Sequence, residues 1–193
     1  MKRIIFASQN KGKVKEVVQI LTGLDIEIIS LADMSELIEI TEDGDSFEAN
    51  ALIKAKQVYN KFNLPTIADD SGLVVDQLNG APGIYSARYA GEDGNDKANN
   101  KKLLDQLKNY PEPHNAKFIC AAVYYDGEEV HTAIGEFNGR IIDKEHGSYG
   151  FGYDPLFVPD GYSITSAEMK PALKNSISHR FNAFNKLKKI LNK

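Results

Sequence analysis

The sequence predicts an α/β fold, a mixed sheet flanked by helices in a single domain that covers residues 1–193. In the first half, short β-branched runs alternate with amphipathic helical segments, which is typical of parallel strands joined by helical crossovers. In the second half, two apolar runs flank Asp126-Gly127, which indicates an antiparallel hairpin. A chain of 193 residues, 42% of them apolar, suits one large domain or two small lobes.

The first 65 residues are expected to form two strands and two helices. The strands cover Arg3–Ala7 and Ile26–Ile29. Between them a polar loop leads into a helix that ends at Gly23 and whose inner face is Val14, Val17, Val18 and Leu21. Asp45 or Ser46 caps the second helix, whose inner face is Phe47, Ala51, Leu52, Ala55, Val58 and Tyr59 and which ends before Pro65.

The rest of the chain is expected to form four strands and two helices. A strand over Thr66–Ala68 leads into Asp69-Asp70-Ser71-Gly72, and a separate strand covers Leu73–Leu78. After a loop over 79–83, a lysine-rich helix spans 95–110. The hairpin strands cover 117–125 and 129–137, and one final amphipathic helix has an inner face of Ile177, Phe181, Phe184, Leu187 and Leu191.

The composition argues against several classes of protein. A net charge of −4 disfavours a nucleic-acid coat and a polybasic membrane anchor, so we expect neither nucleic acid nor membrane as a partner. The longest apolar run, Phe118–Tyr125, is far shorter than the roughly 18 residues of a membrane span. A single cysteine can form no internal disulfide, so we expect an intracellular, cytoplasmic protein.

The charges are segregated along the chain. Residues 25–48 contain nine acids and no Lys or Arg, whereas residues 169–193 contain seven Lys or Arg and no acid. Two solvated faces are the simpler interpretation. The alternative is a site that requires both carboxylates and cations, such as one for metal-bound polyphosphate.

The first polar loop has the pattern strand, Ser-x-Asn-x-x-Lys, helix, over Ser8–Lys13. A helix N-terminus presents free backbone N–H groups and a partial positive charge, so it can bind an anion, and Lys13 would add a full charge. The loop is not a Walker motif, because Ala7 and Val14 occupy positions where that motif requires Gly and Ser or Thr. An ordinary capped helix would explain the pattern equally well.

Two adjacent acids, Asp69 and Asp70, follow a short apolar run. Neighbouring carboxylates repel each other unless a cation, hydrogen bonds or protonation relieves them. Mg²⁺ is the natural cation, since it accepts one or two carboxylates and completes its shell with water and phosphate oxygens. The alternative is an Asp/Ser/Gly turn, and Ser71 as a nucleophile is disfavoured because no Gly-x-Ser-x-Gly elbow surrounds it.

Three weaker patterns complete the candidates. Asn50 and Lys54 share a helix face, which alone is a common solvated pattern. The stretch 151–155 joins two aromatic residues to an acid, a combination that can bracket a nucleobase or form a buried turn. The donors of Ser178-His179-Arg180 are usually surface groups, and Cys120 is most simply a buried core thiol.

In their order along nearly the whole chain, these motifs resemble the inosine triphosphate pyrophosphatase family. The matching blocks are Ser8-x-Asn10-x-x-Lys13-x-x-Glu16, Glu42, Phe47-Glu48-x-Asn50-Ala51, Ala68-Asp69-Asp70-Ser71-Gly72-Leu73, Gly83-Ile84-Tyr85-Ser86-Ala87-Arg88, Phe151-Gly152-Tyr153-Asp154-Pro155 and Ser178-His179-Arg180. The Asp-Asp-Ser-Gly-Leu and Gly-Ile-Tyr-Ser-Ala-Arg blocks are highly specific to the family. The resemblance implies an elongated mixed α/β fold with two lobes around a substrate cleft, usually as a homodimer, and Mg²⁺-dependent hydrolysis of ITP, dITP and XTP to the monophosphate and pyrophosphate.

The resemblance also implies roles at matching positions. Asp70 would be the active-site carboxylate and a metal ligand, Glu42 a second metal ligand, and Ser71 a substrate contact. The phosphates would be bound by Ser8, Gln9, Asn10, Lys11, Gly12 and Lys13, and the nucleobase by Phe151, Gly152, Tyr153, Asp154, Lys174, His179 and Arg180. One departure is Tyr149, which stands where the family is usually richer in glycine.

The chemistry of these residue types agrees with that reaction. Lys13 and Lys54 can neutralise phosphate charge. Donors from His179 or Arg180 to a 6-oxo group, with Asp154 accepting N1–H, would leave adenine with unpaired groups that cost about 1–3 kcal/mol each. Two alternatives are a different Mg²⁺-dependent phosphohydrolase and a nucleotide- or RNA-binding module without catalysis. The acids favour an enzyme, and the negative net charge disfavours RNA.

Overall fold

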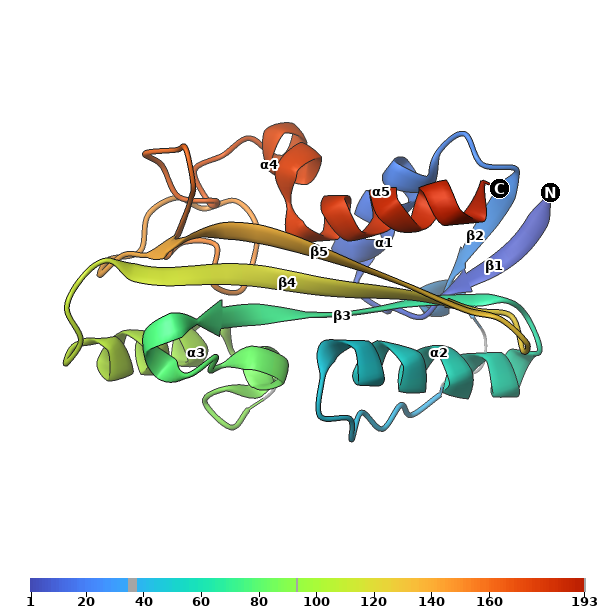
Figure 1. The fold of residues 1–193 in the computed structure, drawn as a ribbon, viewed down its shortest axis with the longest axis horizontal. Coiled ribbons are helices and arrows are strands. Elements are labelled where there is room, and N and C mark those ends of the chain that lie inside the picture. Colours follow the sequence, from blue (N-terminus) through green and yellow to red (C-terminus); the bar gives the residue numbers. More distant parts are fainter. Residues whose placement is uncertain (35–37, 93, 193) are drawn as a thin grey trace. The chain divides into compact units, whose positions relative to one another are not determined.

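The chain folds around a six-stranded mixed sheet in the computed structural model, which describes residues 1–34, 38–92 and 94–192 (Figure 1). The strand order is β2-β1-β3-β4-β5-β6. β1 pairs in parallel with β2 and β3, whereas β5 and β6 are antiparallel, which confirms the predicted mixed sheet. The strands are β1 (Lys2–Phe6), β2 (Ile26–Ser30), β3 (Thr66–Val75), β4 (His114–Tyr125), β5 (Val130–Ile141) and β6 (Phe157–Pro159).

Three of the α-helices, α1, α2 and α3, begin at side-chain caps that the sequence supplies. The side chains of Asn10, Ser46 and Asn95 each accept the backbone N–H three residues on, so Ser46 rather than Asp45 caps the second helix. The α-helices are α1 (Lys11–Leu21), α2 (Phe47–Phe62), α3 (Asp96–Leu107), α4 (Pro171–Ile177) and α5 (His179–Leu191). The short 3₁₀ helices are η1 (Leu31–Asp33), η2 (Asp76–Leu78) and η3 (Gly83–Arg88).

The chain divides into two compact units. The terminal unit comprises residues 1–70, 120–135 and those from His179 onward, and the central unit comprises 71–119 and 136–178. Because the divisions fall within β3, β4 and β5, each of these strands contributes residues to both units. Among the described residues, no helix is long and apolar enough to cross a membrane.

The core of the terminal unit lies between its strands and two helices. α1 and α5 pack against each other and cover one face of the strands, while α2 covers the opposite face (Figure 1). Phe6 of β1 meets Phe184 of α5 edge to face, with ring centroids 5.8 Å apart. Val17 and Leu187 are buried in the same cluster. The helices thereby hold the carboxyl ends of β1 and the first part of β3 in fixed positions.

The central unit has a separate apolar core. Leu103 and Leu107 of α3 are buried with Phe118, Phe137 and Phe157 of the strands. The ring centroids of Phe118 and Phe157 are 4.8 Å apart, and those of Phe137 and Phe157 are 5.4 Å apart. α3 is therefore fixed by its C-terminal half, which leaves its first turns to support neighbouring loops.

The structure differs from the expected elements at three places: β3, the last helix and β6. β3 is one strand that continues through Asp69-Asp70-Ser71-Gly72, where two strands around a turn were expected, and 76–78 form η2. The last helix is two helices, because Ser178 adopts an extended conformation between α4 and α5. Ile177 consequently packs in the central core rather than with Phe184. β6 was not expected, since three residues carry too short a pattern.

Candidate active site

The first polar loop is shorter than predicted, because α1 already begins at Lys11. Asn10 Oδ1 accepts the N–H of Lys13 at 3.1 Å, and Ser8 Oγ accepts the N–H of Asn10 at 3.2 Å. Gln9, Lys11 and Gly12 are exposed, whereas Ser8 and Lys13 are partly buried. The side chain of Lys13 turns to Asp69, with its Nζ 3.5 Å from Oδ2. A helix N-terminus and one inward-facing lysine are thus held together.

Asp69 and Asp70 are adjacent in sequence but contact different helices. Successive side chains of a strand point to opposite faces of the sheet. Asp69 contacts Lys13 of α1 and Arg180 of α5, whereas Asp70 Oδ2 accepts a hydrogen bond from Nδ2 of Asn50 on α2 at 3.2 Å. The strand therefore directs the two carboxylates to opposite faces, where each has its own partners.

Asp69 is a buried anion surrounded by cations. Its Oδ2 accepts hydrogen bonds from Nε and Nη2 of Arg180 at 3.3 and 3.2 Å, and its backbone oxygen accepts one from Nζ of Lys54 at 3.0 Å. Burial by itself would raise the pKa of Asp69, but the charges of Lys13, Arg180 and Lys54 outweigh it and hold the pKa well below its usual range. Asp69 is therefore ionised at neutral pH.

Asp70 is the opposite case. Burial, aided by the negative charges of Glu42 and Asp69, raises the pKa of Asp70 to about 6, although Lys54 and Asn50 act to lower it. Two chemically identical neighbours thus differ strongly in acidity. A carboxyl with a pKa near neutrality is suited to accept a proton or to exchange it for a metal ion.

Glu42 is positioned by one face of α2. Nζ of Lys54 lies 2.7 Å from Oε1 of Glu42. Gln57, one turn further on, binds both backbone groups of Thr41: its Oε1 accepts the N–H at 3.3 Å and its Nε2 donates to the oxygen at 3.0 Å. The role of Gln57 was missed, although Asn50, Lys54 and Gln57 have the i, i+4, i+7 spacing of a single helix face.

The segment that carries Glu42 approaches α2 too closely for a side chain. The N–H of Gly44 donates to Oδ1 of Asn50 at 2.9 Å. A Cβ at Gly44 would lie 2.8 Å from both Cβ of Ala49 and Oδ1 of Asn50. Asn50 therefore holds Asp70 with its amide nitrogen and the Glu42 segment with its amide oxygen. A buried amide in contact with both groups couples the two carboxylates.

The donor set around Asp70 fits a hard divalent cation. Glu42 and Asp70 supply carboxylate oxygens. The negative charge of Glu42 is one of the causes that raise the pKa of Asp70. Mg²⁺ is bound through one or two carboxylates and keeps several waters. Among the described residues, no three His, Cys, Asp or Glu side chains form a closed metal cage. The two carboxylates could therefore hold a divalent cation whose remaining ligands come from water or a substrate.

His179 and Arg180 open α5 and are both buried. Nη1 of Arg180 donates to Oε2 of Glu16 on α1 at 3.0 Å, so the guanidinium joins Glu16 to Asp69. Its three nitrogens are thus directed at carboxylates of the terminal unit. Gly135 allows this helix start, because a Cβ there would lie 2.2 Å from the backbone oxygen of His179. Glu16 belongs to the first motif, but no pattern in the sequence pairs it with Arg180, which lies 164 positions away.

In the central unit, Asp154 organises the loop that was predicted to bind a base. Its Oδ2 accepts the N–H of Phe151 at 3.0 Å and forms an ion pair with Lys174. Nζ of Lys174 also lies 5.3 Å from the centre of the Phe151 ring, whose residue is 45% exposed. A Cβ at Gly150 would lie 2.0 Å from Oδ2 of Asp154, so the tight turn requires glycine. Phe151, Asp154 and Lys174 are therefore brought together as expected.

Tyr153 and Ser71 have supporting positions in the same unit. Tyr153 is buried, and its hydroxyl donates to the backbone oxygen of Ser86 at 2.9 Å. Oγ of Ser86 accepts the N–H of Leu73 at 2.9 Å and donates to the oxygen of Gly83. Ser71 is partly buried in β3. The Gly-Ile-Tyr-Ser-Ala-Arg block thus links the loop of residues 150–154 to β3 through its serine, Ser86. Tyr149, the departure noted above, is half exposed.

The chain is similar to known proteins over nearly its whole length. The sequence profile of the Ham1 family matches residues 4–190. A dITP/XTP pyrophosphatase of Oceanobacillus iheyensis is 50% identical over 99% of this chain and 98% of its own length, and one of Bacillus subtilis is 47% identical over 99% and 98%. Among solved structures, the Ham1 protein of Staphylococcus aureus superposes with a TM-score of 0.90 at 40% identity, covering 99% of this chain and 98% of its own. A HAM1 protein of Coxiella burnetii gives 0.93 at 36% identity, covering 100% and 99%.

Proposed function

Because the chain belongs to the Ham1 family, we propose that it is a nucleoside-triphosphate pyrophosphatase acting on the non-standard purine nucleotides ITP, dITP and XTP. Water attacks the α-phosphorus, the α–β phosphoanhydride breaks, and the products are the monophosphate and pyrophosphate. The relatives from Oceanobacillus iheyensis and Bacillus subtilis, which match this chain over nearly their full lengths, are named dITP/XTP pyrophosphatases. This agrees with the resemblance found in the sequence. The observation that carries the proposal is the division of the acid pair, with Asp70 beside Glu42, Asn50 and Lys54.

The terminal unit supplies the groups that a triphosphate requires. Lys13 and the N–H groups at the start of α1 offer positive charge to the phosphates, and Lys54 adds a second ammonium group. Glu42 and Asp70 would hold Mg²⁺, which neutralises phosphate oxygens when it is bound. Asp70, with a pKa of about 6, is ionised at neutral pH yet basic enough to accept the proton of the attacking water.

The central unit supplies the groups that a 6-oxo purine requires. The exposed ring of Phe151 offers a stacking face, the ammonium of Lys174 is a donor for O6, and the Asp154 carboxylate is an acceptor for N1–H. Adenine presents the opposite pattern and would leave those groups unpaired, at about 1–3 kcal/mol each. Arg180 donates to Asp69 and Glu16 in this structure, so we assign it to the support of the carboxylate pair. The role of His179 as a donor to the base remains a prediction from the resemblance.

Product analysis tests the proposed function. ITP, XTP, GTP and ATP are each incubated with the protein and Mg²⁺, and the products are separated. We expect pyrophosphate and the monophosphate from ITP and XTP, with ATP much slower. Release of orthophosphate would exclude cleavage at the α–β bond, and equal turnover of ATP and ITP would exclude the base-recognition account.

Two further properties belong to the proposal. We propose that the protein is a homodimer and that it acts on the nucleotide pool of the cytoplasm, both by resemblance to its family. Light scattering coupled to gel filtration tests the first, since a dimer has twice the mass of the 21.4 kDa chain.

A further inference from the structure

We infer that Asp96 and Asn100 of α3 are positioning residues for the base loop, residues 150–154. Oδ2 of Asp96 accepts the N–H of Gly152 at 2.7 Å, and Nδ2 of Asn100 donates to the oxygen of the same glycine at 3.3 Å. Both backbone polar groups of one residue are therefore bound to one helix. The inference rests on the proposed function, because it concerns the loop that contacts the base.

Gly152 is the residue of this loop that needs such support. Its φ is +62°, in the left-handed region, and nothing lies within 4 Å of where a Cβ would be. Its neighbours are fixed by other means: the N–H of Phe151 by Asp154, and the Tyr153 hydroxyl by Ser86. Binding the N–H and the oxygen of Gly152 fixes the two peptide planes on either side of it. Those planes set the direction of the Phe151 ring and the entry into Tyr153.

α3 is a suitable support for this purpose. Asp96 and Asn100 are one turn apart and share a helix face. Asn100 is 4% exposed, and burying an amide is costly unless it is hydrogen-bonded. Its Nδ2 also donates to Oε1 of Glu145 at 2.8 Å, which holds the amide in place. The hydrogen bond to Asp96 is shorter and charge-assisted, so we expect it to contribute the larger share.

We call the two hydrogen bonds from Asp96 and Asn100 to Gly152 the clamp. The neighbouring Asn99 shows that the clamp is specific to the loop of residues 150–154. Asn99 is also buried, but its amide binds the N–H of Ala90 at 2.7 Å and the oxygen of Ala87 at 3.0 Å. Two adjacent asparagines thus hold two different segments. A helix that served only as packing would not direct each buried amide to the backbone of a separate loop.

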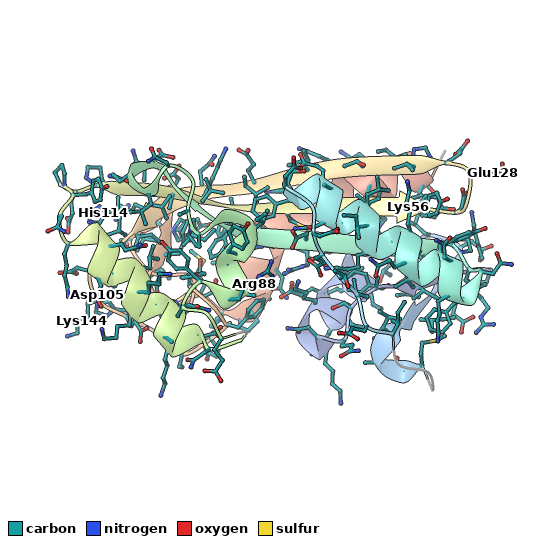
Figure 2. All side chains as sticks on the ribbon, turned by 90° about the horizontal axis from the view of Figure 1, so that it is seen from below. Lys56, Arg88, Asp105, His114, Glu128 and Lys144 are labelled. Carbon is teal, nitrogen blue, oxygen red and sulfur yellow. The ribbon has the colours of Figure 1, made fainter. Side chains whose placement is uncertain are left out.

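The test compares Asp96→Ala with Asp105→Ala. Both remove one acid from the surface of α3. Asp105, which Figure 2 labels on this helix, contacts Lys101 and Lys108 rather than the loop. Hydrogen exchange of the Gly152 amide is measured without nucleotide, and KM, kcat and the ITP-to-ATP ratio of kcat/KM are measured with Mg²⁺. Thermal unfolding is recorded for each protein.

For Asp96→Ala we expect about tenfold or greater acceleration of Gly152 exchange and a similar rise in the KM for ITP, because the charge-assisted hydrogen bond to the Gly152 amide is lost. The ITP-to-ATP ratio should fall while kcat changes less than about threefold. Asp96→Asn, which keeps an acceptor oxygen, should recover part of the loss. Asp105→Ala should match the wild type in all these quantities.

Unchanged Gly152 exchange in Asp96→Ala would overturn the clamp. Faster exchange with an unchanged KM and ITP-to-ATP ratio, or an equal effect from Asp105→Ala, would overturn the positioning role. A wild-type protein that does not release pyrophosphate from ITP would instead refute the proposed function, and the exchange measurement would still decide the clamp. Asn100→Ala, in comparison with Asn99→Ala, gives a second test: only the former should accelerate Gly152 exchange.

Discussion

At the scale of single residues, the acid pair of β3 shows how position determines acidity. Asp69 faces Lys13 and Arg180 and stays ionised, whereas Asp70 faces Asn50 and Glu42 and has a raised pKa. The sequence predicted that the two acids need relief from repulsion, and that expectation is met. It did not predict that the relief comes from opposite faces of one strand, because the cations on Asp69 come from residues up to 111 positions away.

Asp70→Asn tests the cost of holding this carboxyl in the site. A carboxyl whose pKa rises from 3.8 to about 6 on folding binds its proton more tightly in the folded state. Its contribution to stability therefore falls as pH rises from about 4 to 6, and above that it destabilises the fold by up to about 3 kcal/mol. In EDTA we expect Asp70→Asn to melt at a higher temperature than wild type at pH 8 and at an equal temperature at pH 4. In a separate assay with Mg²⁺ at pH 8, the variant should show almost no turnover. A variant less stable than wild type at pH 8 would contradict this account.

Asp69→Asn should have the opposite effect on stability. Because its pKa is lowered in the folded protein, the stability that Asp69 contributes is present above the unfolded pKa and is lost as pH falls below it. Removing the charge leaves Arg180 buried without this partner, at a cost of about 3–5 kcal/mol. Urea unfolding at pH 7 measures the loss. Asp105→Asn, in an exposed group of ion pairs, is the control and should unfold at the same urea concentration as wild type.

At the scale of elements, α2 is the part of the site that sequence reasoning described least completely. Its cap, its inner face and the shared face of Asn50 and Lys54 were all predicted. Its hold on the Glu42 segment was not, because Gln57 and Gly44 act through backbone contacts that have no pattern of their own. The break at Ser178 was missed for a similar reason: no Pro or Gly marks it, and Arg180, at the start of α5, is bound by Asp69 and Glu16, which are distant in sequence.

Gln57→Ala tests whether α2 positions Glu42. The variant loses both hydrogen bonds to Thr41, so Glu42 should be held less firmly. We expect the Mg²⁺ concentration for half-maximal activity to rise severalfold, while the melting temperature falls by less than about 3 °C because the lost bonds are exposed. Lys56→Ala, on the same helix but directed at Tyr125, is the control. An unchanged Mg²⁺ requirement in Gln57→Ala would exclude this role for Gln57.

At the scale of the whole molecule, three strands join two cores. The mixed sheet, the parallel first half and the hairpin were predicted from hydrophobic periodicity and turn residues. The division into two compact units was anticipated only through length and resemblance, because nothing in β3, β4 or β5 marks the boundary as a linker. A boundary inside continuous strands has no compositional signal, since each strand keeps the apolar residues that its own core requires.

Phe184→Ala tests whether the cores unfold together. Phe184 is fully buried in the terminal core, and its truncation should cost about 3–5 kcal/mol. Since β3, β4 and β5 contribute residues to both units, we expect one calorimetric transition that moves to lower temperature as a whole. Two separated transitions, with only one of them shifted, would show that the central unit folds independently.

The pleat of β3 also has a consequence for how this protein can tolerate insertions. Moving the acid pair by one position along the strand would preserve every letter of the Asp-Asp-Ser-Gly-Leu block, yet it would turn Asp70 to the sheet face on which Arg180 lies and Asp69 to the face on which Asn50 lies. Asp70 would then lie on the face of the cations and stay ionised, and Asp69 would lose its contacts with Lys13 and Arg180. The proposed function therefore depends on the number of residues between the start of β3 and the motif as much as on the motif itself. A one-residue insertion at 68 should abolish turnover, whereas one in the loop before β3 can be absorbed.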